Sequence, residues 1–396
     1  NPWGYHAFNL VVHILAALTL FGLVRRTIAL CQSRGRKPTD TSFVTGLAPG
    51  ALFAWAVALL WAVHPLQTQS VTYVIQRGES LMGLFYLLTL YCAIRGLNSS
   101  RRYGWYAAAI VACALGMASK AVMVTAPVMV FIYNLVFLRR GSSGRRWVLY
   151  AGLAATWGVL WMCGVTGEVL DPGTQRSHVG FGYHGITPLE YAATQPGVIL
   201  NYLRLSFWPV GLCLDYDWPI ATTAIVIIPP ALVVLLLFGV TVWGLVRRSW
   251  LGFVGAWFVI ILAPTSSFIP IKDLAFDHRM YLPLAAVIAV VVFVGKTLLD
   301  AFFGRLSTGL NVMKWTGGAA TVVIAMLLTH GTYQRNKDYH SDLAIWADVA
   351  AKRPHNARAR VAVGNAMLAR NRVDEAITAY REAVAIRPDF ADGQCA

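Results

Sequence analysis

A short charged motif, Asp277-His278-Arg279, stands directly before an apolar segment that begins at Tyr281. An arginine that faces outward at such a boundary offers a rigid fork of donors that matches a phosphate group. Asp277 would orient this arginine, or bind a sugar hydroxyl or a metal, and His278 would support the same site. The alternative for Arg279 is an interfacial side chain that reaches lipid headgroups. The motif is therefore compatible with a phosphate site or with an interfacial arginine at a membrane surface.

A second polar stretch, residues 64–79, begins with His64 and separates two apolar segments. Its polar residues fall at helical spacing, which predicts one surface helix with a polar face. They are Thr68, Gln69, Thr72, Gln76 and Glu79. Such a face would form the floor of a sugar site, with Arg77 as a further phosphate contact. An ordinary interfacial connector is the alternative.

Lys120 lies between two short apolar segments. A charge near membrane depth is costly and tends to be functional, so Lys120 is a third candidate for a phosphate contact. At a helix end the same side chain could instead reach the interface. Further along, the run 215–218 (Asp-Tyr-Asp-Trp) could stack on and hydrogen-bond a sugar, or place an interfacial tryptophan beside loop acids.

The elements that must position these residues are apolar helices. Of the 396 residues, 57% are hydrophobic and 13% are charged, whereas soluble domains carry about 25% charged residues. Ten segments approach the roughly 20 apolar residues that a spanning helix needs. They are 5–24, 46–63, 80–95, 103–119, 121–138, 147–165, 222–246, 249–265, 281–299 and 315–330. Segment 193–213 is interrupted by Arg204 and by Trp208-Pro209, and is expected to be interfacial or re-entrant.

The basic residues give this bundle an orientation. Alternate connecting loops hold 17 Lys and Arg residues, and the opposite loops hold six. Positive residues collect on the cytoplasmic side, so Asp277, Lys120 and the C-terminal tail are expected on the outer side. The net charge of +15 is explained by this topology and does not indicate nucleic-acid binding. The spacing of Cys, His and acidic residues indicates no metal site.

The tail, residues 331–396, changes to a charged helical pattern with the period of a tetratricopeptide repeat (TPR). Trp346, Val349 and Pro354 lie 34 residues before Tyr380, Ala383 and Pro388, and 34 residues is the length of this repeat. The pattern predicts a half-repeat over 340–354 and a full repeat over 355–388. Its small, aromatic and breaker positions are Gly364, Ala376, Tyr380, Ala383 and Pro388. The predicted fold is thus all-α, with a polytopic membrane bundle over 1–330 followed by the start of a TPR array.

Taken together, these motifs resemble bacterial relatives of the transmembrane and tetratricopeptide-repeat O-mannosyltransferases. The resemblance rests on the His64-Pro65 to Arg77 stretch, Ser119-Lys120, Thr194-Gln195 and residues 277–283, and on the trailing repeats. It departs from the family at Gln69, Ala121 and Asp277, where the family more often has Glu.

The resemblance implies a GT-C-type glycosyltransferase of the bacterial inner membrane, with its TPR tail on the periplasmic side. Such an enzyme takes a sugar, mannose in the eukaryotic relatives, from a polyprenyl-phosphate carrier and transfers it to a protein hydroxyl. A divalent metal is compatible with this chemistry. The family's catalytic carboxylate lies in a first outer loop, which is expected to precede residue 1, so this chain is interpreted as an inactive piece of a longer enzyme.

Two other functions fit the same sequence. One is a membrane-anchored TPR scaffold without catalytic activity, for which an acid-free first outer loop would be the discriminating feature. The other is a transporter of lipid-linked sugars, which predicts polar groups at mid-membrane and paired internal repeats. The sugar, the acceptor and the oligomeric state are not predicted by the sequence.

Overall fold

The computed structural model describes residues 2–35, 50–138, 146–164, 179–180, 185–305 and 310–388. Within these ranges the regular elements are all helices, and one isolated antiparallel bridge joins Val179 to Ile271. The all-α prediction is therefore confirmed. The sequence also predicts an outer substrate loop over 166–192, and most of that segment lies outside the described residues.

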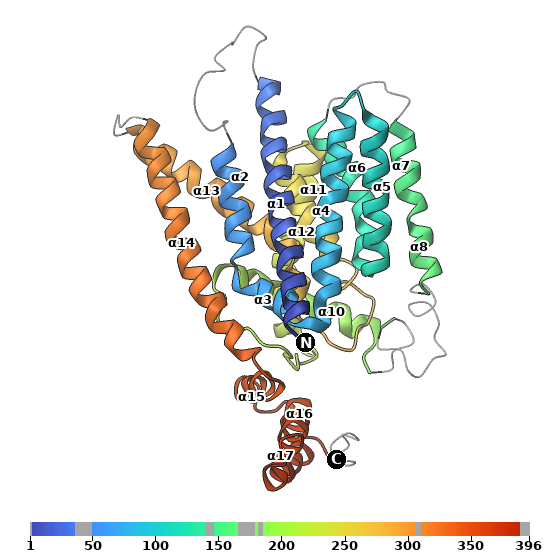
Figure 1. Ribbon diagram of the computed structural model, residues 1–396, viewed down its shortest axis with the longest axis vertical. Coiled ribbons are helices and arrows are strands. Elements are labelled where there is room, and N and C mark those ends of the chain that lie inside the picture. Colours follow the sequence, from blue (N-terminus) through green and yellow to red (C-terminus); the bar gives the residue numbers. More distant parts are fainter. Residues whose placement is uncertain are drawn as a thin grey trace.

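Each of the ten predicted apolar segments is helical, and all ten run along the bundle (Figure 1). The elements are α1 (Pro2–Gly35), α2 (Ala51–Ala62), α4 (Arg77–Leu97), α5 (Arg102–Ser119), η3 with α6 (Ala121–Thr125 and Ala126–Phe137), α7 with α8 (Arg146–Ala155 and Trp157–Met162), α11 (Ala224–Val246), α12 (Trp250–Leu262), α13 (Pro283–Arg305) and α14 (Leu310–Asp338).

Length and hydropathy single out a smaller set as membrane-crossing. Four described helices are long and apolar enough: Trp3–Gln32, Val74–Leu97, Ala224–Val246 and Pro283–Phe302. Ala51–Ala62 together with Pro65–Thr72, bent by 53°, would make a fifth. The count of ten spans therefore stays a prediction.

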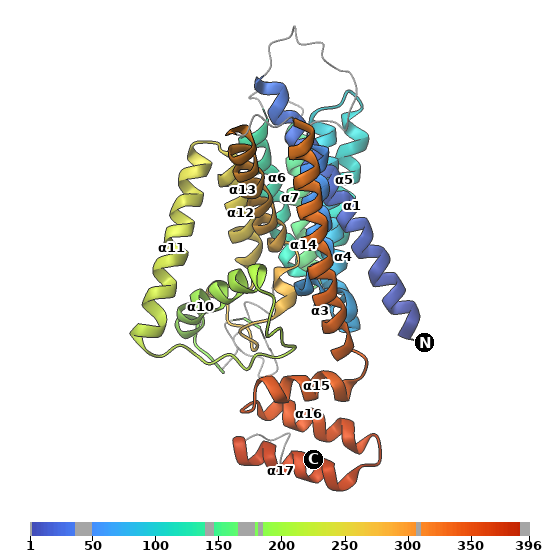
Figure 2. The ribbon, with the colours of Figure 1, turned by 90° about the vertical axis from the view of Figure 1, so that its left-hand side faces the viewer.

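Helix α10 (Pro188–Phe207) lies crosswise at the end of the bundle, near the start of α11 (Figure 2). Its first turn is fixed by a capping box, in which Thr187 and Glu190 each satisfy a backbone N–H of the other. The assignment of this segment as an interfacial or re-entrant helix stays a prediction. The N-terminus, α10 and the C-terminal helices all lie at the same end of the bundle (Figure 1).

The polar stretch 64–79 is not the single surface helix that its spacing predicts. It forms η1 (Pro65–Gln67), α3 (Thr68–Thr72) and η2 (Val74–Gln76), with extended backbone at Tyr73 between the last two. Thr68, Gln69 and Glu79 are buried rather than exposed, with Gln69 2% and Glu79 4% exposed, and Thr72 and Gln76 are half-buried. The prediction is wrong because these side chains bind neighbouring segments, so no continuous polar face remains.

A buried tyrosine ties the charged motif to the bundle. The motif forms η4 (Asp277–Met280), and Tyr281 follows it. The Tyr281 hydroxyl lies 2.9 Å from His13 Nδ1, and its carbonyl accepts a 2.7 Å bond from Trp61 Nε1. A Cβ on Gly83 would lie only 2.3 Å from the Tyr281 ring, so a glycine is required there. These contacts fix where η4 can lie.

The tail forms α15 (Asp342–Lys352), α16 (Ala357–Leu368) and α17 (Val373–Ile386), which project from the end of the bundle (Figure 2). Helix α15 falls within the predicted half-repeat, and α16 and α17 within the predicted full repeat. A Cβ on Gly364 would lie 2.4 Å from the Tyr380 ring, which explains the small residue at that position. Ala376 and Ala383 are buried beside Tyr380, whereas Pro388 follows the end of α17 and is exposed.

Candidate functional site

An ion pair joins two of the predicted site residues at the end of the bundle that carries the TPR helices. Lys120 lies in extended backbone where α5 ends, and its Nζ contacts a carboxylate oxygen of Glu79 in the first turn of α4. The Glu79 side chain is 5% exposed and that of Lys120 is 28% exposed. The lysine side chain is therefore held in place and stays partly exposed, as a side chain that binds a charged ligand must be.

His278 is held next to this pair by Gln69. The Gln69 Oε1 accepts the backbone N–H of His278 at 2.7 Å and lies 3.2 Å from the His278 Nδ1. The ring stacks on Phe276 at 4.8 Å between centroids. Burial lowers the pKa of His278 well below its usual range, and the positive charges of Lys120 and Arg279 lower it further. The imidazole is therefore neutral at physiological pH.

Asp277 is buried against a tyrosine that the sequence did not mark as its partner. The Tyr216 hydroxyl donates a 2.6 Å bond to Asp277 Oδ1. Burial raises the pKa of Asp277 to about 6, although the Tyr216 hydroxyl and the charge of Arg335 oppose this shift. This carboxyl group therefore gains and loses a proton closer to neutral pH than an ordinary aspartate.

The Arg279 side chain is buried, and backbone carbonyls occupy its hydrogen-bond donors. Its Nη1 donates to the carbonyls of Thr265 at 3.0 Å and Leu274 at 2.9 Å, and its Nη2 donates to the Asp273 carbonyl at 2.6 Å. The residue is 7% exposed. The expected outward arginine is thus a buried one whose donors hold the loop between α12 and η4.

Of the two remaining predicted site residues, His64 has a structural role and Arg77 is exposed. The His64 Nδ1 accepts the backbone N–H of Leu66 at 3.2 Å, and its Nε2 donates to the Ser206 carbonyl at 3.2 Å, so both ring nitrogens are engaged. Arg77 is exposed at the start of α4, with its guanidinium 5.5 Å from the ring of Tyr5. It lies two residues before Glu79 in the first turn of α4.

The structure thus pairs Glu79 with Lys120 and Gln69 with His278, and the two pairs lie near enough for the charge of Lys120 to act on His278. Sequence reasoning missed Tyr216 as the partner of Asp277 and Arg335 as the nearby positive charge. No spacing rule links either of them to residue 277. No group of three or more His, Cys, Asp or Glu that could hold a metal occurs in the part of the chain that the structure describes.

Comparison with known proteins gives this geometry a context. A family model described as a TPR repeat matches residues 364–396. Protein O-mannosyl-transferase Tmtc3 of Drosophila melanogaster is 22% identical, over 98% of this chain and 46% of the fly protein. Protein O-mannosyl-transferase F38B6.6 of Caenorhabditis elegans is 21% identical, over 98% of this chain and 51% of the worm protein.

A shorter match has a higher identity. Protein O-mannosyl-transferase TMTC2 of Homo sapiens is 28% identical over 144 residues, which are 35% of this chain and 15% of the human protein. The chain spans about half the length of the curated relatives that it matches end to end. No solved structure matches it. Proteins named as O-mannosyl-transferases therefore cover nearly the whole chain at low identity, and a TPR repeat lies at its end.

Proposed function

We propose that this chain is the membrane domain and first repeat of a glycosyltransferase that moves a sugar from a polyprenyl-phosphate carrier to a protein hydroxyl. Mannose is the first candidate sugar, because the relatives are named for mannosyl transfer. The observation that carries the proposal is the Lys120–Glu79 pair at the end that bears the TPR helices. It supplies a positioned cation where a lipid phosphate and a protein acceptor would meet.

The reaction is an inverting displacement. A carboxylate of the full-length protein, which the resemblance places in a first outer loop, removes the proton of the acceptor hydroxyl. The hydroxyl oxygen bonds to the anomeric carbon, the bond from that carbon to the phosphate oxygen breaks, and polyprenyl phosphate leaves. Negative charge develops on the leaving phosphate, and cations already in position stabilise it at little reorganisation cost.

The residues of this chain divide these tasks. Lys120 neutralises the leaving phosphate, and Arg77 at the exposed edge gives a second contact. Glu79 holds Lys120 in place before the donor binds. Neutral His278 and Gln69 connect η4 to α3 and line the site without adding a competing charge.

Arg279 has a positioning role in this proposal. Its bonds to three carbonyls keep the loop over residues 265–274 in place. Asp277, whose carboxyl accepts the Tyr216 hydroxyl, fixes the loop that leads to α11. These two residues support the phosphate site and do not form its contacts.

The TPR helices would hold the acceptor near the donor, which raises its effective concentration. In this orientation the site and the repeats face the periplasm of a bacterial cell, and the lysine- and arginine-rich loops face the cytoplasm. The full-length protein in membranes, given labelled polyprenyl-phosphate mannose, is expected to move label into protein. That transfer would disappear when an acid in the first outer loop is substituted. A full-length protein without such an acid, and without transfer, would favour the scaffold.

A further inference from the structure

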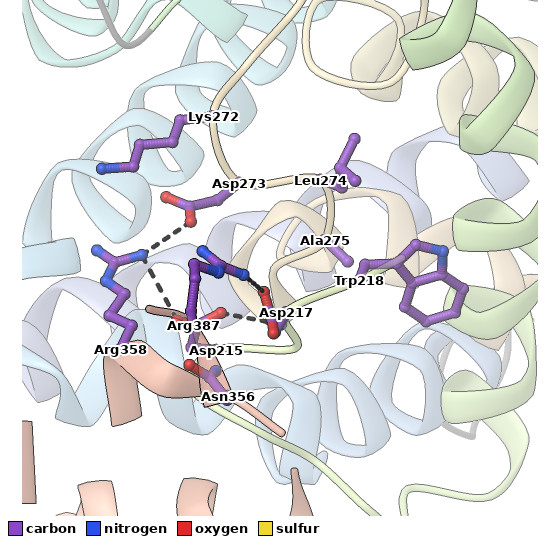
Figure 3. Close-up of a pocket in the computed structure, with 10 residues that line it drawn as sticks. All are labelled: Asp215, Asp217, Trp218, Lys272, Asp273, Leu274, Ala275, Asn356, Arg358 and Arg387. Atoms are coloured by element: carbon purple, nitrogen blue, oxygen red, sulfur yellow. Dashed lines mark hydrogen bonds and ion pairs between the residues drawn. The ribbon is translucent and has the colours of Figure 1, made fainter. Parts of the chain in front are cut away.

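A small cavity lies where the first TPR repeat meets the loops at the end of the bundle. Its volume is about 180 Å³, below the roughly 300–1,000 Å³ of pockets that hold drug-sized ligands. Figure 3 shows Arg358, Arg387 and Asn356 on one side of it and Trp218, Leu274 and Ala275 on the other. It therefore has room for one small ring and not for a long peptide.

The charges around this cavity balance. Arg358 of α16 pairs with Asp273 at 2.9 Å and with Asp215 at 3.5 Å, and Arg387 pairs with Asp217 at 3.8 Å. With Lys272, three basic and three acidic residues line the cavity, so their formal charges sum to zero. Such a lining gives no net attraction to a phosphate or to a carboxylate, and favours a neutral polar ligand.

An unpaired amide indicates what that ligand offers. Asn356 lines the cavity and is 2% exposed. Its Oδ1 accepts the N–H of Ala359 at 3.0 Å and caps α16, whereas its Nδ2 is buried without a partner among the described residues. A buried donor left unpaired is unfavourable. Because Nδ2 is closed to solvent in this geometry, a ligand oxygen in the cavity would satisfy it once the side chain shifts toward the cavity.

We propose that this cavity binds a neutral saccharide unit carried by the acceptor protein. Sugar hydroxyls both donate and accept, so they can use the Asn356 amide as a donor and the Asp215 and Asp217 carboxylates as acceptors. The C–H groups of the sugar ring pack against the apolar side formed by Trp218, Leu274 and Ala275. The site is separate from the Lys120–Glu79 pair, and the inference goes beyond the proposed transfer because it concerns a sugar that is already attached.

The test is a binding measurement on the full-length protein in nanodiscs, which does not depend on turnover. Three probes are titrated: a peptide with one O-mannosyl serine, the same peptide without sugar, and polyprenyl-phosphate mannose. We expect the mannosyl peptide to bind more tightly than the bare peptide. Asn356→Ser keeps a capping oxygen and removes the amide donor, so it should weaken that binding roughly threefold to tenfold.

Two further variants control for folding. Asn356→Asp keeps the cap and the side-chain shape but replaces the donor with a carboxylate, and it should weaken binding as well. Ser341→Asn exchanges the cap of α15 outside the cavity and should leave binding unchanged. Equal binding of the bare peptide would overturn the proposal in favour of a peptide site. Asn356-dependent binding of the lipid-linked sugar alone would assign the cavity to the donor, and unchanged binding by both Asn356 variants would also refute it.

Discussion

Removing the charge of Lys120 is the most direct test of how the proposed site handles the leaving phosphate. Two unit charges about 4 Å apart interact by about 1 kcal/mol in water and by about 4 kcal/mol in the setting of a protein surface. Lys120 is 28% exposed, so its interaction with a phosphate lies between these limits. Lys120→Ala should therefore lower kcat roughly fivefold to a thousandfold.

The assay is single-turnover transfer from labelled polyprenyl-phosphate mannose by the full-length protein in proteoliposomes. Lys120→Arg keeps the charge and should retain most of the rate. The matched control is Lys296→Ala. It removes a lysine of α13 that pairs with Asp300 and whose side chain is 57% exposed. An unchanged kcat in Lys120→Ala, with a folded protein, would refute the assignment of the phosphate contact.

Three further changes test the surrounding structure. Arg279→Lys keeps the charge but cannot reproduce the bonds to three carbonyls, so it should lower the thermal unfolding midpoint nearly as much as Arg279→Ala. A lysine variant as stable as the wild type would instead show that charge alone matters. Gly364→Ala should destabilise the repeat by roughly 1–3 kcal/mol through overpacking against Tyr380. Gly158→Ala, with open space around its Cβ, should not destabilise, and equal effects in chemical unfolding would contradict the packing argument. The pKa of Asp277 is raised from 3.8 to about 6, so its ionisation should lower folding stability as pH rises from about 4 to about 6. Asp277→Asn should remove that loss and be more stable at pH 7; a pH dependence of unfolding identical to the wild type would exclude this carboxyl as its source.

Hydrophobic segments and the repeat period gave sequence analysis its firmest predictions. Each of the ten apolar segments is helical, because a run of apolar residues in a helix satisfies its backbone internally wherever it lies. The TPR could be predicted from the sequence equally well, because its contacts join residues that are close in the chain. Gly364 and Tyr380 are 16 residues apart and meet on adjacent helices. Their spacing alone is therefore enough to predict that they pack together.

The candidate site could be predicted from the sequence only in part, because its contacts join segments that are far apart in the chain. Glu79 and Lys120 were each singled out, but nothing in their spacing showed that they form a pair across 41 positions. The sequence did not show which groups bind Arg279. The backbone carbonyls that accept its hydrogen bonds lie within residues 265–274, and only the folding of that loop brings them to the guanidinium. The stretch 64–79 has helical periodicity, yet the bonds from Gln69 to η4 and from Thr72 to Asn336 compete with a continuous helix.

In the proposed reaction, polyprenyl phosphate leaves as the sugar is transferred to a protein hydroxyl. The most direct measurement follows both products of one reaction, with the sugar and the lipid carrying different labels, in membranes that contain the full-length protein. We predict that free polyprenyl phosphate appears in a one-to-one ratio with sugar bound to protein hydroxyls. Sugar transfer without release of the lipid phosphate, or neither product from any polyprenyl-phosphate sugar, would contradict the account.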